Sequence, residues 1–245
     1  MYIVQKIKWS NSKERCVKEI NFYIGRPKMI IPEHIFFLLL AYLTGSFPSA
    51  VWVGKTFYNK DVREYGSGNA GATNTFRVLG KRAGIPVLLM DVFKGWISVN
   101  YIMFVSNGCN PFTETVTASQ FEIQLAFGIA AVVGHLFPIY TGFRGGKGIA
   151  TLLGLLIGLN PLAALASMSV FVLVFFVSKY VSLGSILASI VFPIVVFFVL
   201  EDKVVNSSLE IFSIFVPILT LITHQKNIER LIRGKENKAK FGKKK

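Results

Sequence analysis

The stretch that decides the fold is IATLLGLLIGLNPLAALASMSVFVLVFFVS, residues 149–178. These 30 uncharged residues are too many for one ordinary membrane helix, which needs about 20 apolar residues to cross the hydrocarbon. The sequence GLNP at 158–161, near the end of its first third, is typical of a turn. We therefore predict two membrane helices here, of which the first is short.

The whole chain has the composition of a membrane protein. Of its 245 residues, 52% are hydrophobic and only 16% are charged, and the mean hydropathy is +0.53. The net charge of +14 would suggest nucleic acid in a soluble protein, but the basic residues lie mainly between and after the apolar runs. No nucleic-acid partner is therefore expected. Cys16 and Cys109 lack metal-ligand spacing, so neither a disulfide framework nor a zinc site is predicted.

Splitting residues 149–178 predicts an all-α integral membrane protein with seven transmembrane helices. The other apolar runs are 35–58, 85–106, 123–140, 181–200 and 211–223. A signal peptide is not predicted at the first run, because its apolar part is too long and a long basic stretch precedes it. The predicted organisation is a basic extension at 1–33, a membrane domain at 34–234 and a basic tail at 235–245.

Loop charge favours an odd number of helices. If the first helix exits into the cytoplasm, the inside segments carry 18 of the 27 lysines and arginines, and the outside loops carry only Lys203. The inside segments are 54–82, 142–148, the corner at 179 and the residues from 224 onward. This bias is expected of cytoplasmic loops, and it predicts a cytoplasmic C-terminus. Seven basic residues before the first helix contradict it, but the other loops together outweigh that one flank.

The first inside loop contains GSGNAGATN, residues 66–74. Its glycines let backbone N–H groups approach an anion, its Ser, Thr and Asn side chains add donors, and Arg77 adds a planar cation. A flexible turn between two helices would have a similar composition. The G-x-G-x-x-G spacing, with Asp91 twenty residues further on, imitates a dinucleotide-binding motif. We reject that interpretation because membrane helices flank the loop, whereas the motif requires a βαβ unit.

The second inside loop contains GFRGGKG, residues 142–148, directly before a helix. Arg144 and Lys147 can balance a dianion, and the start of the helix adds unpaired N–H groups and a positive dipole end. The loop is not a Walker A motif, because Thr141 and Gly148 stand where that motif needs Gly and Ser or Thr. A cytoplasmic location would explain the two cations, but it would not explain four glycines in seven residues.

Two weaker candidates lie at the other inside corners. Ser182 can cap the sixth helix or donate to a ligand, and capping is the more common role. His224 and Asn227 share one helical face where the last membrane helix ends, although a lone surface histidine is usually inert.

Three ionisable residues lie near or within the predicted spans. Asp91 and Lys94, near the start of the second helix, are expected to pair or to face the bundle interior. His135, late in the third helix, can be a ligand or a packed residue, and packing is favoured. Under the seven-helix topology the polar loops and corners all lie on one face of the membrane, so one site can use them together.

Taken in order, these motifs resemble the bacterial PlsY family, the acyl-phosphate:glycerol-3-phosphate 1-acyltransferases. The matching segments are GSFP (45–48), GSGNAGATN (66–74), GHLFP (134–138), GFRGGKG (142–148), YVSL (180–183) and HQKN (224–227). The resemblance covers roughly residues 35–234. Two features depart from it: the basic extension before the first helix, and Gln225, where many relatives carry Arg.

The resemblance implies seven helices in the bacterial inner membrane, a cytoplasmic C-terminus and cytoplasmic phosphate-binding loops. It implies transfer of an acyl group from acyl phosphate to the 1-hydroxyl of glycerol 3-phosphate, with membrane lipid as a further partner and no metal or cofactor. The implied catalytic residues are Ser67, Arg77, Lys147, His224 and Asn227. The implied substrate-binding residues are Gly66, Gly68, Asn69, Gly71, Thr73, Asn74, His135, Arg144, Gly145, Gly146 and Ser182.

An acyl phosphate already has a good leaving group, so the reaction needs positioning and charge stabilisation more than a strong base. The proton acceptor is either His224 or an oxygen of a substrate phosphate, and we favour the second. Glu229 is expected to be a charged residue on the solvent-exposed side of a helix. The alternatives are a small-anion membrane transporter, whose binding groups should lie near the bilayer midplane, and a catalytically silent scaffold.

Overall fold

The computed structural model describes residues 32–105, 118–200 and 207–239, and within them all regular structure is helical. The predicted extension, apart from its last two residues, lies outside the described residues. The elements are α2 (Pro32–Ser46), α3 (Ser49–Tyr58), η1 (Val62–Glu64), α4 (Ala72–Leu79), α5 (Lys81–Val99), α6 (Ile102–Val105), α7 (Ala118–Leu136), η2 (Ile139–Thr141), α8 (Ile149–Leu159), α9 (Pro161–Ser178), α10 (Val181–Phe198), α11 (Ser207–Thr223) and α12 (Gln225–Ile232).

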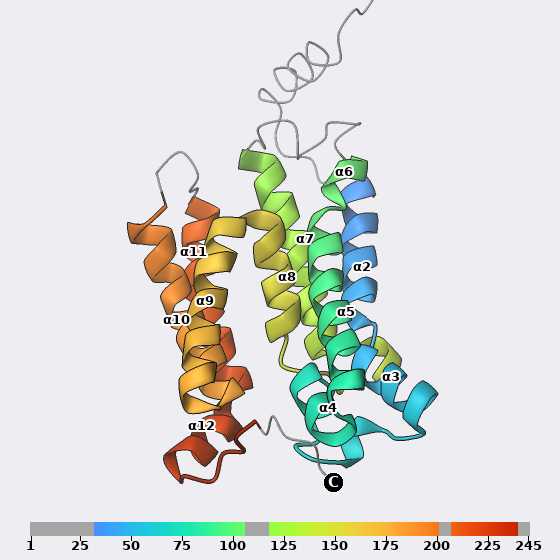
Figure 1. The fold of residues 1–245 in the computed structure, drawn as a ribbon. Helices are drawn as coiled ribbons and strands as arrows, with labels where there is room; N and C mark the ends of the chain where they lie inside the picture. Colours follow the sequence, from blue (N-terminus) through green and yellow to red (C-terminus); the bar gives the residue numbers. More distant parts are fainter. Residues whose placement is uncertain (1–31, 106–117, 201–206, 240–245) are drawn as a thin grey trace, which may run out of the picture.

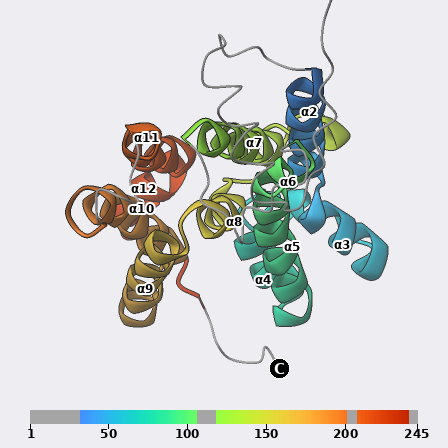
Figure 2. The same ribbon diagram turned by 90° about the horizontal axis from the view of Figure 1, so that it is seen from above.

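The long helices run side by side in two groups (Figures 1 and 2). In the first group α2 packs on α7 and α5 packs on α8, and in the second α10 packs on both α9 and α11. The short elements η1, α4 and α12 lie at the same end of the molecule (Figure 1). This end collects the segments that the sequence predicted to be inside loops.

The predicted division of residues 149–178 is confirmed. α8 ends at Leu159, and the side chain of Asn160 caps α9 by accepting a hydrogen bond from the Ala163 backbone N–H at 2.9 Å. Pro161 occupies the first turn of α9, where its missing N–H costs no helical hydrogen bond. The chain therefore reverses here, and α8 and α9 run in opposite directions (Figure 1).

Helix length and composition give a range for the number of membrane spans. Four segments among the described residues are long and apolar enough to cross a membrane, or up to six if two bent helix pairs, at 43° and 66°, each count as one span. The 11 residues of α8 extend only about 16 Å, roughly half the thickness of the hydrocarbon core. The structure thus supports a multi-helix membrane protein, and the count of seven stays a prediction.

Two details differ from the expected helices. The first span is not continuous over 35–58, because it breaks between α2 and α3 around Phe47 and Pro48. Pro48 lacks a backbone N–H, which explains why the helix breaks there. The first inside loop also contains the short helix α4, which begins at Ala72 and ends at Leu79.

Small residues let α5 and α8 approach closely. A Cβ at Gly95 would lie 2.0 Å from the Thr151 carbonyl oxygen, and one at Gly154 would lie 1.9 Å from the Val92 carbonyl oxygen. Close backbone packing of this kind is typical of helix pairs in membranes, where lipid removes the usual hydrophobic drive between helices. The contact fixes α8, which begins directly after the 142–148 loop.

An ion pair is buried where α3, α5 and α7 meet. Asp91 accepts a hydrogen bond from Ser49 Oγ and pairs with Lys94 Nζ at 2.9 Å, and the same Asp91 oxygen lies 3.5 Å from His135 Nδ1. Lys94 also donates to the Phe47 carbonyl oxygen at 3.1 Å. The pairing of Asp91 with Lys94 and the packing of His135 are both confirmed.

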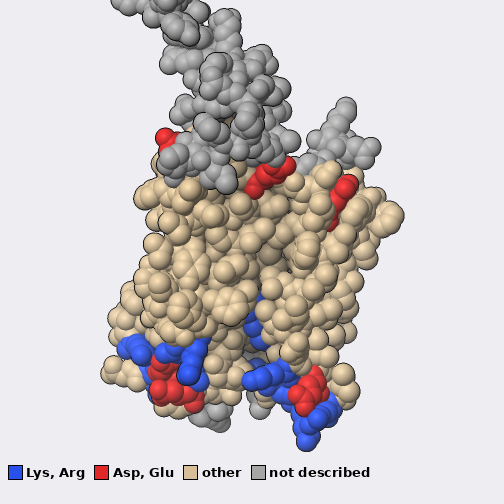
Figure 3. Space-filling view, turned by 180° about the vertical axis from the view of Figure 1, so that it is seen from behind, with Lys and Arg blue, Asp and Glu red and all other residues tan. Residues whose placement is uncertain are grey.

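Charged side chains sort to the two ends of the molecule. In the view of Figure 3, lysines and arginines gather at one end, whereas the described part of the other end shows carboxylates alone. Between the ends, large apolar side chains such as Phe36, Leu173 and Phe198 are more than 60% exposed. This apolar surface is suited to lipid, and the asymmetry of charge agrees with the positive-inside rule.

Candidate functional site

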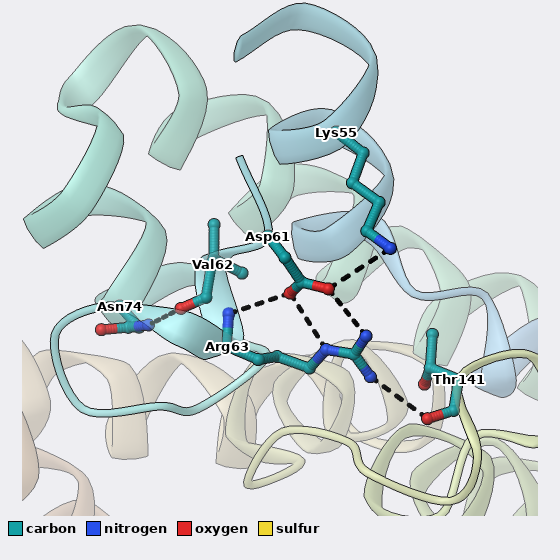
Figure 4. Close-up of polar contacts among 6 residues, drawn as sticks. All are labelled: Lys55, Asp61, Val62, Arg63, Asn74 and Thr141. Carbon is teal, nitrogen blue, oxygen red and sulfur yellow. Dashed lines mark hydrogen bonds and ion pairs between the residues drawn. The ribbon is translucent and has the colours of Figure 1, made fainter. Parts of the chain in front are cut away.

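Asn74, on α4, holds the shape of the first glycine-rich loop. Its Nδ2 donates to the Val62 and Tyr65 carbonyl oxygens at 2.7 and 3.0 Å, and its Oδ1 accepts from the Ser67 backbone N–H at 2.9 Å (Figure 4 shows the contact with Val62). Gly66 has φ +64°, and a Cβ there would lie 2.4 Å from Asn74 Oδ1. Both N–H groups of the Asn74 amide are used within the loop, so Asn74 has a structural role there, and its expected substrate-binding role stays a prediction.

Arg63 connects this loop to the second one. Its guanidinium binds Asp61 through two hydrogen bonds, at 3.0 and 2.7 Å, and donates a third to the Thr141 carbonyl oxygen at 3.2 Å (Figure 4). The bonds from Arg63 outweigh burial and, with Lys55 3.4 Å away, hold the pKa of Asp61 well below its ordinary value. The carboxylate therefore stays ionised and holds Arg63, which reaches Thr141 just before the second loop. Neither residue of this pair was among those predicted from the sequence.

A cavity of about 580 Å³ lies between the two loops. Gly68 lines it from the first loop, and Arg144 and Gly145 line it from the second. The remaining lining residues are Asp61, Arg63, Glu64, Thr141 and Gly142. Because Asp61 and Arg63 offset each other, the lining charges left are the cation Arg144 and the carboxylate Glu64.

The second loop rests on His135, at the end of α7. A Cβ on Gly145 would lie 2.0 Å from the His135 carbonyl oxygen, and one on Gly146 would lie 2.1 Å from His135 Nε2. The Gly146 N–H donates to that carbonyl at 3.1 Å, and His135 Nδ1 bonds Thr151 Oγ1 at 3.1 Å. The close approach of the loop backbone to His135 explains why these two positions are glycine. His135 packs against the loop and is not among the residues that line the cavity.

Lys147 reaches from this loop to α12, where its Nζ donates to Asn227 Oδ1. This bond joins the two helix groups of the molecule. Burial lowers the pKa of Lys147 to about 8, with Glu236 opposing the change and Arg230 and Arg77 adding to it. The charge of Arg77, on α4, thus affects Lys147, on the second loop. This effect is expected if the two loops form one site.

Glu236, just after α12, gathers three side chains around one carboxylate. It accepts hydrogen bonds from Ser182 Oγ at 3.1 Å, Asn227 Nδ2 at 2.9 Å and Arg230 Nε at 2.9 Å. Burial opposes its ionisation, but these three bonds outweigh burial and hold the pKa of Glu236 below its ordinary value. Tyr180 is the N-cap of α10 and no side chain caps that helix, so the capping role favoured for Ser182 is wrong.

His224 lies at the break between α11 and α12 and is only 3% exposed, so it is not a surface histidine. Its Nδ1 lies 2.9 Å from the Thr220 carbonyl oxygen. A carbonyl only accepts, so Nδ1 carries the proton and Nε2 the lone pair. Burial, followed by the charge of Lys147, lowers the pKa of His224 to about 4. The imidazole is therefore neutral at pH 7 and a weak base.

The structure divides the predicted residues by position. Lys147, Ser182, His224 and Asn227 form one cluster, with Arg77 in electrostatic range. Gly68, Arg144 and Gly145 line the cavity, and Gly66, Gly71, Asn74, His135 and Gly146 shape the loops. Ser67 and Thr73 are exposed and Asn69 is half-buried on the first loop and the start of α4.

Sequence reasoning missed Arg230 and Glu236. Arg230 stands three residues after Asn227, so the rule that such neighbours share a helical face would have found it. Glu236 had no comparable signal. It reaches the cluster only because the chain turns back after α12 at Gly234, which has φ +65°.

Comparison with known proteins places this arrangement in a family. Residues 35–234 match the family described as glycerol-3-phosphate acyltransferase. A relative of that name from Staphylococcus carnosus is 41% identical over 208 residues, covering 84% of this chain and 98% of the relative. One from Enterococcus faecalis is 41% identical over 216 residues, covering 85% and 93%.

The fold is similar to that of PlsY, described as an integral membrane glycerol 3-phosphate acyltransferase. The crystal structure of its glycerol 3-phosphate form superposes with a TM-score of 0.72 at 34% identity, covering 84% of this chain and 96% of that one. Its lysophosphatidic acid form gives 0.67 at 33% identity, covering 84% and 95%. The resemblance inferred from the six motifs is thus confirmed over nearly the whole membrane body, and the chain belongs to the glycerol-3-phosphate acyltransferase family.

Proposed function

We propose that this protein transfers an acyl group from acyl phosphate to the 1-hydroxyl of glycerol 3-phosphate. The products are 1-acylglycerol 3-phosphate and inorganic phosphate, and the reaction begins phospholipid synthesis at the cytoplasmic face of the bacterial inner membrane. The observation that carries the proposal is the contact of Lys147 with Asn227. It joins a glycine-rich phosphate loop to the polar start of α12 in a member of this family.

The cations are assigned to the two substrate phosphates. Lys147 is partly buried, with Arg77 and Arg230 close enough to affect its charge, and an ion in such a setting stabilises a phosphate more strongly than one in bulk water. The cavity beside Arg144 and Gly145 is a second place for an anion. A single loop, 142–148, thus faces both places, which suits a reaction between two phosphate-bearing substrates.

The proton of the attacking hydroxyl is assigned to an oxygen of a substrate phosphate. As the hydroxyl oxygen bonds the acyl carbon, the bond from that carbon to the departing phosphate breaks. The pKa of about 4 for His224 argues against this residue as the main base, since efficient bases have a pKa near the working pH. Its Nε2 lone pair is instead available to orient the hydroxyl. No metal or cofactor enters the proposal, because acyl phosphate already carries a good leaving group.

The small-anion transporter receives no support. The matching relatives are named as acyltransferases. Arg230 also lies in α12, at the end of the molecule where the predicted inside loops collect (Figure 1), whereas a transporter would place its binding groups near the midplane.

Donor choice gives a direct test. Purified protein in detergent should acylate glycerol 3-phosphate with a long-chain acyl phosphate and show little turnover with acyl-CoA or acyl carrier protein, because the loops suit a small phosphate better than a bulky thioester carrier. Product formation from radiolabelled glycerol 3-phosphate measures both. Comparable rates with acyl-CoA would exclude the proposed donor, and no rate with any donor would exclude acyl transfer.

Topology gives a test of α8 as a span. In a variant with Cys16 and Cys109 changed to serine, a cysteine at Phe143 should react with a membrane-impermeant thiol reagent only after cell lysis, and one at Ser207 should react in intact spheroplasts. Three crossings, α8, α9 and α10, separate these positions if α8 spans, and two if it does not. Labelling of both from the same side would therefore remove α8 from the spans and end the seven-helix model.

A further inference from the structure

The residues after α12 fold back onto the corner between α9 and α10. The Ala239 N–H donates to the Lys179 carbonyl oxygen at 2.8 Å, and Lys238 Nζ lies 5.5 Å from the centre of the Tyr180 ring. Residues 235–239, which the sequence assigned to a basic tail, thus pack on the membrane body. This packing brings Glu236 into the cluster, with its side chain only 5% exposed.

Glu236 determines which way the Asn227 amide points. A carboxylate only accepts hydrogen bonds, so the Asn227 nitrogen must face Glu236, where Nδ2 lies 2.9 Å from Oε1. The amide oxygen then faces Lys147 and accepts a hydrogen bond from its ammonium. A chain of two hydrogen bonds therefore runs from Glu236 through Asn227 to Lys147.

We infer that Glu236 is a positioning residue for acyl transfer, whose carboxylate orients Asn227 toward Lys147 and balances the charge of Lys147 among its cationic neighbours. The inference rests on the proposed function and deepens it. Because Ser182, Asn227 and Arg230 all donate to this carboxylate, one acidic side chain holds together groups from α10 and α12.

The charge balance around Lys147 makes the inference testable. The charged groups that act on it are Arg77 from α4, Arg230 from α12 and Glu236 after α12, and the neutral His224 lies within range of it at the α11–α12 break. Burial lowers the pKa of Lys147 to about 8 even though Glu236 raises it. Removal of the carboxylate would lower this pKa further, by about one unit or more, the usual effect of one close charge. Lys147 would then lose its proton near neutral pH.

Glu236→Gln keeps an acceptor oxygen but removes the charge. Since Lys147 acts as the ammonium, activity falls as pH rises through its pKa, and a lower pKa moves that fall to lower pH. We expect the alkaline limb of kcat/KM to shift down by about one unit, so that the variant loses about fivefold relative to the wild type at pH 8 and recovers most of its activity at pH 6.5. Glu236→Ala also loses the acceptor and should remain impaired at pH 6.5.

Glu229→Gln is the matched control. It makes the same chemical change close by, but the Glu229 side chain is 55% exposed and pairs with Arg233 at 2.9 Å on the outside of α12. Its pH profile should equal that of the wild type. A wild-type profile for Glu236→Gln as well would overturn the inference, and higher activity in Glu236→Gln would overturn it by showing that the carboxylate competes with substrate.

A readout without catalysis separates this inference from the proposed function. The pH dependence of amine acylation at Lys147, followed by mass spectrometry on the full chain without substrates, reports the pKa of that ammonium directly. We expect the midpoint to fall in Glu236→Gln and to stay unchanged in Glu229→Gln. An inactive wild type with this shift would reject acyl transfer while retaining the charge balance. An active wild type with no shift would reject the inference alone.

Discussion

Lys147→Ala is expected to lower kcat for acyl transfer by about a hundredfold or more, the scale typical of removing one electrostatic stabiliser. Its ammonium is the cation that links the glycine-rich loop to Asn227, and partial burial strengthens its interaction with a phosphate. Steady-state kinetics with acyl phosphate and glycerol 3-phosphate measure the loss. Protein yield and thermal stability should barely change, because the side chain lies between segments that are also joined by other contacts.

Lys147→Arg should restore only part of the activity, since a planar guanidinium does not reproduce a compact ammonium in a crowded loop. Two controls remove positive charge without touching the loop: Lys226→Ala, an exposed position on α12, and neutralisation of lysines 243–245, which belong to the predicted basic tail and lie outside the described residues. Both should retain most activity. If the controls fail while Lys147→Ala works normally, the loop is a topology signal and the active centre lies elsewhere.

Asp91→Ala is expected to destabilise the protein by about 3–5 kcal/mol, the usual cost of breaking a buried ion pair from one side. The variant leaves the ammonium of Lys94 without its carboxylate in the bundle interior, where both side chains are at most 7% exposed. It also removes the acceptor that holds Ser49. Thermal inactivation in detergent measures the loss.

The double variant Asp91→Leu, Lys94→Met tests the cause. It replaces both charges by apolar groups of similar size, which is often nearly neutral for stability in other buried pairs. We expect it to regain most of the stability lost in Asp91→Ala. A double variant as unstable as the single one would show that the hydrogen bond from Ser49 or the packing against His135, rather than the unpaired ammonium, accounts for the effect.

Features that depend on neighbouring residues were readable from the sequence. Apolar length and the turn at Asn160 and Pro161 predicted α8 and α9, because a capping side chain and a proline act within one turn of helix. Asp91 and Lys94 were expected to pair because they stand three residues apart on one face of a helix. Motif order was sufficient to indicate the family, since the order of short loops is itself a sequence property.

The roles of individual polar side chains depended on contacts between distant segments. Asn74 carries an amide that suits a phosphate, yet the amide nitrogen donates to carbonyl oxygens beside its own loop. Lys147 and Asn227 are 80 residues apart, and Ser182 and Glu236 are 54 apart. A carboxylate in a basic tail is expected to be solvated. Glu236 is buried because the chain folds back after α12. Local sequence therefore determined the helices and the chemical groups available, whereas tertiary packing decided which groups face each other, because that choice depends on burial and on partners that no local pattern contains.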